Sequence, residues 1–242
     1  MAEAGAKVWI SDLFEDKAGA VAEELRKDGL QADSLKTDVL NRASLEEALN
    51  KVGELDILIN SAGGNMKEAT TSPDLSFFDL PVDALQKVVA LNLFGGALLP
   101  SQVFGKKMIG KREGAVILNI SSMNALRPLT RIPGYSAAKA AVSNFTQWLA
   151  VHIAQEYNPL LRVNALAPGF FLTEQNRFLL TDRETGEMTP RGKTIIAHTP
   201  MGRYGAPEDL AGATLWLCSD AAAFVTGIVV PIDGGFSAFS GV

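Results

Sequence analysis

The sequence predicts an α/β fold in three layers, with a parallel sheet covered by helices on both faces. Short apolar runs alternate with longer amphipathic stretches along all 242 residues, and this alternation is typical of β-α-β units. Two of the runs, Ile57–Ile59 and Val116–Leu118, are apolar at every position, as expected for strands buried on both faces. No linker or repeat interrupts the pattern, so we expect one domain over residues 1–242.

The expected elements follow one another in regular order. Strands are short apolar runs closed by polar or turn-forming residues, and helices carry Ala, Val and Leu at helical spacing. We expect strands at Val8–Ser11, Leu30–Lys36, Leu55–Asn60, Ala115–Ser121, Arg162–Leu166 and Ile228–Ile232. We expect helices at Asp16–Lys27, Ser44–Val52, Val82–Lys107, Tyr135–Tyr157 and Pro207–Cys218. Ser44 with Glu47 three residues later matches a capping box, which predicts that Ser44 caps its helix.

Composition and charge argue against several classes of protein. The net charge of −5 argues against a nucleic-acid partner. A single cysteine, Cys218, and two distant histidines, His152 and His198, argue against a disulfide or a metal site. No apolar run reaches the roughly 20 residues of a membrane span, and the start after Met1 lacks a signal-peptide pattern. We therefore expect a cytoplasmic protein with no membrane partner.

Polar and turn-forming residues follow each expected strand. In open parallel sheets, ligands bind beyond the carboxyl ends of the strands. A dinucleotide and a small substrate are therefore expected near these residues: Asp12, Asp38, Asn60, Ser61, Ala62, Gly63, Ser121, Ser122, Pro168, Gly169 and Asp233 to Gly235.

Tyr135 and Lys139 are four residues apart and so share one face of a helix. An ammonium beside a phenol favours the phenolate and lowers its pKa from about 10, which suits acid–base chemistry. Ser122 lies thirteen positions before Tyr135, directly after a buried strand, and Asn92 interrupts an otherwise apolar helix. Taken singly, these residues also fit a surface Tyr/Lys pair and a helix–helix hydrogen bond.

Asp12 ends the first strand and predicts the choice of dinucleotide. A carboxylate at this place accepts hydrogen bonds from both adenosine ribose hydroxyls and repels a 2′-phosphate. Leu13 rather than an arginine follows it, so the sequence favours NAD over NADP. The alternative is that Asp12 caps the next helix.

These residues occur in a familiar order and spacing. Asn60-Ser-Ala-Gly, Asn92, Ser122, Tyr135-x-x-x-Lys139, Pro168-Gly169-x-x-x-Thr173 and a closing Asp233-Gly-Gly resemble the short-chain dehydrogenase/reductase family over the whole chain. The resemblance implies a Rossmann-type doubly wound fold, an NAD cofactor, and hydride transfer between a carbonyl and an alcohol.

The resemblance also implies a role for each residue. Tyr135 is expected to be the general acid–base and Ser122 to polarise the substrate oxygen. Lys139 is expected to lower the Tyr135 pKa and hold the nicotinamide ribose, and Asn92 to hold a water of the proton relay. The remaining cofactor contacts implied are Asp12, Asp38, Val39, Asn60, Ser61, Ala62, Gly63, Pro168, Gly169, Phe171 and Thr173.

Further segments resemble the D-mannonate oxidoreductase, or fructuronate reductase, branch of that family. They include Ala62-Gly-Gly-Asn65, Pro128-Leu-Thr-Arg-Ile-Pro133 and Phe170-Phe-Leu-Thr-Glu-Gln-Asn176. This resemblance implies a sugar-acid substrate, with Arg131 and Arg127 as candidates for its carboxylate. Asn65, Asn124, Gln175 and Asn176 are candidates for its hydroxyls, and residues 171–200 for a lid. Ordinary loop residues, and a gluconate, polyol or 3-oxoacyl substrate, remain as alternatives.

One feature of the family is missing. A glycine-rich turn should follow the first strand and give backbone amides to a pyrophosphate, but no such turn occurs near Met1. Roughly 25–30 residues of a β-α-β unit are lacking, so we expect a chain truncated before its second strand. The alternative is a natural short form whose catalytic residues persist without a complete cofactor site. A non-catalytic form is a further alternative.

An apolar stripe runs along the expected Tyr135–Tyr157 helix, from Ala137 through Ala141, Phe145 and Trp148 to His152. It suits the core or a contact between subunits. The family commonly forms dimers and tetramers through this helix, so we expect a homo-oligomer.

Overall fold

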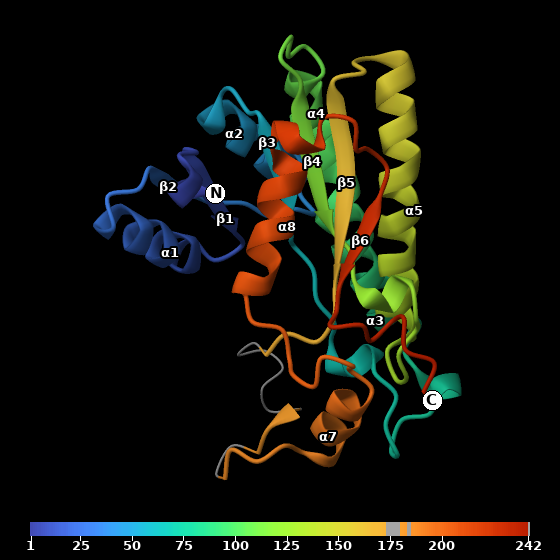
Figure 1. Ribbon diagram of the computed structural model, residues 1–242. Helices are drawn as coiled ribbons and strands as arrows, with labels where there is room; N and C mark the ends of the chain where they lie inside the picture. Colours follow the sequence, from blue (N-terminus) through green and yellow to red (C-terminus); the bar gives the residue numbers. More distant parts are fainter. Residues whose placement is uncertain (173–179, 183–184, 242) are drawn as a thin grey trace.

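The computed structural model describes residues 1–172, 180–182 and 185–241 (Figure 1). Within them six strands run parallel to their hydrogen-bonded neighbours. The strands are β1 (Val8–Asp12), β2 (Ala32–Lys36), β3 (Ile57–Asn60), β4 (Ala115–Ile120), β5 (Leu161–Pro168) and β6 (Val229–Ile232). Each coincides with an expected apolar run, so the parallel α/β class is confirmed.

Helices connect and cover these strands. They are α1 (Glu15–Lys27), α2 (Arg42–Val52), α3 (Val82–Val89), α4 (Leu99–Met108), α5 (Pro133–Glu156), α7 (Pro190–Ala197) and α8 (Glu208–Cys218). A π-helical segment, Ala90–Leu98, joins α3 to α4, so the expected long helix is continuous but not α-helical throughout.

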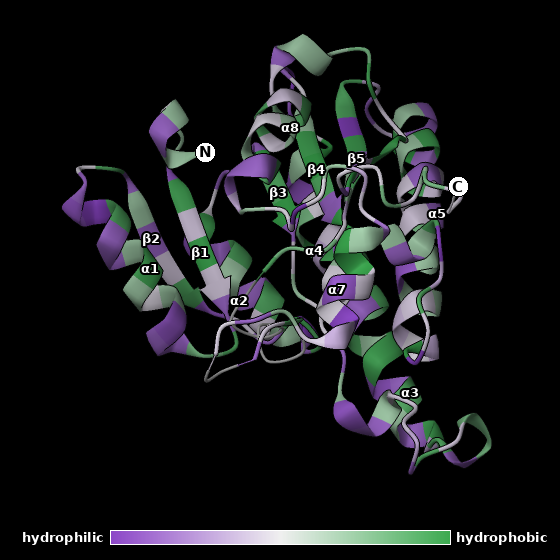
Figure 2. Ribbon diagram, turned by 60° about the horizontal axis from the view of Figure 1, so that its bottom comes forward, coloured by the Kyte–Doolittle hydropathy of each residue, from purple (hydrophilic) through white to green (hydrophobic). Residues whose placement is uncertain are grey.

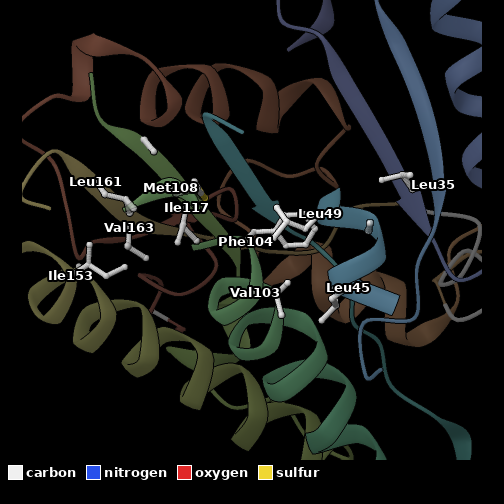
Figure 3. Packing of buried hydrophobic residues seen from close by; sticks show 13 residues of the cluster. Leu35, Leu45, Leu49, Val103, Phe104, Met108, Ile117, Ile153, Leu161 and Val163 are labelled. Carbon is white, nitrogen blue, oxygen red and sulfur yellow. The ribbon is translucent and has the colours of Figure 1, made fainter. Parts of the chain in front are cut away.

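Two clusters of buried side chains form the core on the two faces of the sheet. On one face, side chains of α2, α4 and α5 pack against Ile117 and Val163 (Figure 3). On the other face, Leu217 of α8 packs against Leu118 and Leu166. Ile117 and Leu118 are adjacent and belong to opposite clusters, because successive strand residues point to opposite faces. This explains why the β4 run is apolar at every position.

The strands form two hydrogen-bonded groups rather than one sheet. β1 pairs with β2, and the other four strands pair in the order β3-β4-β5-β6. Figure 2 shows the β1–β2 pair standing apart from the larger group. The ladder is therefore interrupted between β1 and β3.

α2 and α5 each begin two residues earlier than expected. Asn41, not Ser44, caps α2, because the Asn41 side chain accepts from the backbone N–H groups of Ala43 and Ser44. The Ser44 hydroxyl instead accepts from the backbone N–H of Asp38 at 3.0 Å. α5 begins at Pro133, whose fixed φ suits the first turn. α7, which begins at Pro190, was not among the expected helices and lies within residues 171–200, the candidate lid.

The continuous helix Val82–Met108 is long and apolar enough, by length and composition, to cross a membrane. Val88, Val103 and Met108 of this helix are buried against the rest of the protein. Core helices of soluble proteins pass the same test of length and composition.

A stability prediction follows from the close approach of the π-helical segment to the loop after β3. A methyl group at Gly96 would collide with the carbonyl oxygen of Ala62. We expect Gly96→Ala to lower the free energy of unfolding by about 1–3 kcal/mol, measured by urea denaturation.

Gly105→Ala on α4 is the matched control, because a methyl group there meets no atom within 4 Å. It should leave stability unchanged or raise it slightly, since alanine favours helices. Equal destabilisation by both variants would contradict the close approach at Gly96.

Candidate active site

Tyr135 and Lys139 lie in the first two turns of α5, beside the carboxyl end of β4. Ser122 follows β4 and caps a short 3-10 turn, where its hydroxyl accepts from the backbone N–H of Asn124 at 3.2 Å. Lys139 is 4% exposed and Ser122 8%. The structure therefore brings together the three residues that the sequence spacing predicts as a catalytic set.

The Lys139 ammonium is buried with a single described hydrogen-bond acceptor. Its Nζ donates to the carbonyl oxygen of Ile120 at 2.8 Å and lies 5.7 Å from the centre of the Tyr135 ring. Burial disfavours the charged form and lowers the pKa of Lys139 to about 8. The lysine is therefore held near the pH at which it can release a proton.

The pKa of Tyr135 moves in the opposite direction from the prediction. Burial raises it above its usual value, and a hydrogen bond with Ser122 offsets part of that rise. The expected lowering by Lys139 is absent in this state, because desolvation of the phenol dominates and the lysine Nζ hydrogen-bonds to Ile120. Tyr135 is consequently a neutral phenol at neutral pH, which is the form that donates a proton.

Asn92 lies in the π-helical segment and is fully buried. Its amide N–H groups donate to the carbonyl oxygens of Gly64 at 2.6 Å and Val88 at 2.8 Å. Its oxygen accepts from the backbone N–H of Gly64 at 3.1 Å. Both N–H groups are therefore occupied, and binding of a relay water by Asn92 stays a prediction.

The loop after β3 passes directly over this group. A Cβ at Gly63 would lie 2.6 Å from Oδ1 of Asn92 and 3.3 Å from Nζ of Lys139. The loop, the π-helical segment and α5 thus meet at one point, beside the end of β4.

The two predicted adenosine-side carboxylates lie at the ends of β1 and β2. Oδ1 of Asp12 accepts from the backbone N–H of Phe14 at 2.8 Å. Phe14, not Asp12, is the N-cap of α1, so the alternative role of Asp12 as a helix cap is wrong. Oδ1 of Asp38 accepts from the backbone N–H of Leu40 at 2.9 Å. Val39, the residue between Asp38 and Leu40, is half-buried.

The side chain of Asn60, expected to contact the cofactor, forms hydrogen bonds inside the protein instead. Its side chain is 5% exposed and donates to Ser101 at 3.1 Å and to Asn119 at 2.9 Å. Asn119 in turn donates to Thr146 at 2.9 Å. This buried polar network links β3, α4, β4 and α5. Contacts of Asn60, Ser61, Ala62 and Gly63 with a cofactor stay a prediction.

Pro168 and Gly169 end β5 at the same edge of the sheet. The backbone N–H of Gly169 donates to the carbonyl oxygen of Ile232 at 2.9 Å. Phe171 packs against Gly205, and a cavity of about 160 Å³ lies beside it, lined also by Thr199 and Asp233. A larger hollow of about 670 Å³ adjoins Asp38 but reaches none of the catalytic candidates. Thr173, Gln175 and Asn176 lie outside the described residues.

The predicted substrate residues divide into two groups. Asn124 is buried, and its oxygen accepts from the backbone N–H of Leu129 at 2.9 Å. Arg131 is exposed and lies two residues after Leu129, just before α5. Asn65 instead donates to the Thr70 hydroxyl at 2.8 Å. Arg127 donates through Nε to the carbonyl oxygen of Ser237 at 3.1 Å. Asn65 and Arg127 are thus each engaged in a loop contact.

The prediction missed Arg191, the second residue of α7. Its guanidinium is half-buried, and burial together with the positive charge of Arg131 lowers its pKa. No local pattern in the sequence marks it, since 59 positions separate the two arginines.

Comparison with known proteins decides the family. Residues 1–237 match the family model described as enoyl-(acyl carrier protein) reductase. The chain belongs to the short-chain dehydrogenase/reductase family. It is therefore an oxidoreductase of the Rossmann-type fold. The comparisons give no support to the prediction of a truncated chain.

Three relatives illustrate the range of this family. Uncharacterized oxidoreductase UxuB of Bacillus subtilis is 48% identical, over 100% of this chain and 90% of the relative. A solved Haemophilus influenzae structure, provisionally described as a D-mannonate oxidoreductase with bound NAD, is 46% identical with a TM-score of 0.92 and covers 100% and 89% of the two chains. A Burkholderia cenocepacia gluconate 5-dehydrogenase in complex with NADP and tartrate is 32% identical with a TM-score of 0.82, covering 98% and 88%.

The described residues fit the two ends of a nicotinamide dinucleotide. Asp12 and Asp38 offer carboxylates that would hold the adenosine half, and Tyr135 and Lys139 would meet the reacting half. Gly63 leaves room beside Lys139 that a side chain would fill. The expected glycine-rich turn for the pyrophosphate is absent from the sequence. The fit of the cofactor therefore depends on the residues for its adenosine half and for its nicotinamide half.

The buried lysine yields a pH-dependent stability prediction. The fall of the Lys139 pKa from 10.5 to about 8 corresponds to about 3 kcal/mol. Between those values the unfolded chain binds more protons than the folded one, so this group makes stability rise with pH. We expect Lys139→Met to have a higher free energy of unfolding than the wild type. This difference should be larger at pH 7 than at pH 10.

Urea denaturation at the two pH values measures this difference. Lys106→Met, which changes an exposed lysine of α4, is the control and should show a difference independent of pH. If the difference in free energy of unfolding between Lys139→Met and the wild type is the same at pH 7 and pH 10, burial of the Lys139 ammonium does not destabilise the protein.

Proposed function

We propose that this protein is an NAD(H)-dependent oxidoreductase that interconverts a ketone and a secondary alcohol on a sugar acid, D-fructuronate and D-mannonate. The observation that carries the proposal is the cluster of Tyr135, Ser122 and Lys139 at the carboxyl edge of the sheet. A neutral buried phenol, hydrogen-bonded to a serine and close to an ammonium, is suited to exchange a proton with a substrate oxygen.

The proposed mechanism assigns a step to each side chain. When bound, the nicotinamide would supply or accept the hydride. Ser122 donates a hydrogen bond to the substrate oxygen and holds it beside the phenol. Tyr135 donates its proton to that oxygen during reduction and removes it during oxidation. Lys139, with a pKa near 8, returns the proton to Tyr135, and the surrounding burial excludes water.

The choice of NAD rests on Asp12. One of its carboxylate oxygens accepts from Phe14, and the other is available for a ribose hydroxyl. The negative charge repels the extra phosphate of NADP. The Haemophilus influenzae structure with bound NAD supports this choice, although the Burkholderia cenocepacia relative holds NADP.

Two observations support the proposal of a sugar-acid substrate: the positively charged loop before α5 and the descriptions of two relatives. One is provisionally described as acting on D-mannonate and the other is a gluconate 5-dehydrogenase. A gluconate, polyol or 3-oxoacyl substrate is the alternative within the same chemistry. A non-catalytic short form is the alternative outside it, and the assembled Tyr135, Ser122 and Lys139 cluster argues against that role.

Removal of the phenol hydroxyl tests the catalytic assignment. Tyr135→Phe should lower kcat for D-fructuronate reduction by about 100-fold or more, because the proton donor is lost. NADH oxidation followed by absorbance measures the rate. The Kd for NADH should change little.

Tyr157→Phe is the matched control, because Tyr157 is an exposed residue at the other end of the same helix. It should keep full activity. If Tyr135→Phe turns over at a rate close to the wild type, Tyr135 is not the acid–base.

A second test addresses the cofactor. The wild type should bind NADH more tightly than NADPH in a titration followed by tryptophan fluorescence. Asp12→Ser should reduce this preference by about tenfold or more, because the repelling charge is lost while an acceptor for Phe14 remains. Asp16→Ser, which removes an exposed charge of α1, should not.

If the wild type and Asp12→Ser prefer NADH over NADPH equally, another residue discriminates between the two cofactors. Absence of binding for both cofactors would favour the non-catalytic short form.

We also propose that the protein is a homo-oligomer in the cytoplasm. Phe145, Trp148, His152 and Tyr157 form a run of ring contacts along α5, and Trp148 remains 54% exposed. An exposed aromatic face of this kind suits a contact with a second subunit.

A further inference from the structure

We propose that Ser121 is a positioning residue, whose hydroxyl fixes the catalytic turn of α5 against the end of β4. The inference rests on the proposed function for the roles of Tyr135 and Lys139. It adds a residue that acts through Lys139 rather than on the substrate. Because Ser121 directly precedes Ser122, one short segment of chain would place all three catalytic candidates.

The Ser121 hydroxyl is buried and makes two hydrogen bonds to α5. Ser121 is 2% exposed. Its Oγ donates to the carbonyl oxygen of Lys139 at 3.1 Å and lies 2.7 Å from the Oγ of Ser143. A hydroxyl carries one proton, and Ser121 gives its proton to Lys139, so Ser143 is the donor in the second bond. Lys139 and Ser143 are four residues apart and therefore share the face of α5 that meets β4.

The backbone of Ser121 is held by the sheet. Its N–H donates to the carbonyl oxygen of Leu166 in β5 at 2.8 Å. This bond continues the ladder between β4 and β5 by one residue beyond Ile120. Both strands are buried over most of their length, and buried central strands are among the last parts of a fold to open. The hydroxyl of Ser121 is thus a fixed point to which α5 is attached.

Lys139 is held at its main chain and at its side chain by successive residues. Ser121 binds its carbonyl oxygen, and the carbonyl oxygen of Ile120 accepts from its Nζ at 2.8 Å. A shift or a rotation of α5 would therefore lengthen at least one of the two bonds. Ser122 follows and hydrogen-bonds to Tyr135, which lies one turn before Lys139. The Ser121 contact consequently sets how Tyr135 and Lys139 lie relative to Ser122.

A second contact holds the start of α5 from the other side of Ser122. Oδ1 of Asn124 accepts from the hydroxyl of Ser136 at 3.4 Å and from the backbone N–H of Leu129 at 2.9 Å. The contact with Ser136 is longer than the usual range for two hydroxyl or carbonyl oxygens, and long hydrogen bonds are weak. We therefore assign the positioning role to Ser121 rather than to Asn124.

The first test removes the Ser121 hydroxyl and follows Lys139 without a substrate. In protein labelled with carbon-13 at the lysine Cε, the NMR signal of Lys139 is identified by its absence in Lys139→Met. Its pH titration in the wild type should have a midpoint near 8, because burial lowers the pKa of Lys139 to about 8. In Ser121→Ala the loosened turn admits water, so the midpoint should rise by about half a pH unit or more.

Hydride transfer gives a second readout. Ser121→Ala should lower kcat for D-fructuronate reduction by about tenfold or more, because small displacements of catalytic groups are costly. The KM for D-fructuronate should change little. Ser143→Ala removes only the second bond and should cause a smaller loss in the same direction. Its addition to Ser121→Ala should have little further effect, because the two hydroxyls act through one contact.

Thr146→Val is the matched control. Thr146 is fully buried, and its hydroxyl also joins β4 to α5, because it accepts from Nδ2 of Asn119 at 2.9 Å. This contact lies farther along α5 from the catalytic turn. Thr146→Val should therefore lower the free energy of unfolding, as Ser121→Ala does, but leave the Lys139 midpoint and kcat unchanged. Urea denaturation compares the stabilities, and circular dichroism shows that each variant is folded.

Three results would overturn the positioning role of Ser121. They are an unchanged Lys139 midpoint in Ser121→Ala, an equal change of midpoint in Ser121→Ala and Thr146→Val, and a raised KM with an unchanged kcat. The last result would make Ser121 a substrate-binding residue. If the wild type does not reduce D-fructuronate, the proposed substrate fails, and the Lys139 midpoint alone decides the role of Ser121.

Discussion

A buried lysine ammonium is the constraint on which the active site depends. Lys139 is nearly inaccessible, and its described hydrogen bond goes to the carbonyl oxygen of Ile120. Burial of a charge with so little compensation is costly, and the lowered pKa of Lys139 expresses that cost. The arrangement persists because α5 and β4 pack tightly through the core below it. The same packing that destabilises the charge gives it a pKa suited to proton transfer near neutral pH.

The loop after β3 and the π-helical segment pack around the buried Lys139. The loop after β3 crosses it at Gly63, where a side chain would collide with Asn92 and crowd Lys139. The π-helical segment places Asn92 so that its amide binds both backbone groups of Gly64. π-Helical turns occur frequently at functional sites, and here the turn fixes the loop over the lysine. Further inside, the Asn60, Asn119 and Thr146 network satisfies its own polar groups, so it supports the strands without competing for the substrate.

Much of the fold could be predicted from the sequence, because buried parallel strands are continuous apolar runs with little ambiguity. The shared helix face of Tyr135 and Lys139 could also be predicted, since their spacing alone sets it. Other features depend on contacts between distant residues and have no local signal. The cap of α2 is Asn41 because the Ser44 hydroxyl is used by Asp38. The direction of the Tyr135 pKa shift depends on burial of the phenol, which has no local signal in the sequence.

On the proposed function, Arg131 would link the length of the substrate to catalysis. Only three residues separate it from Tyr135. The carbonyl oxygen of Arg131 accepts from the backbone N–H of Thr71 at 2.9 Å, and α5 begins two residues after Arg131. If the carboxylate of the substrate binds at Arg131, a substrate would be productive only when its acid group and its reacting carbon are separated by a matching length of chain.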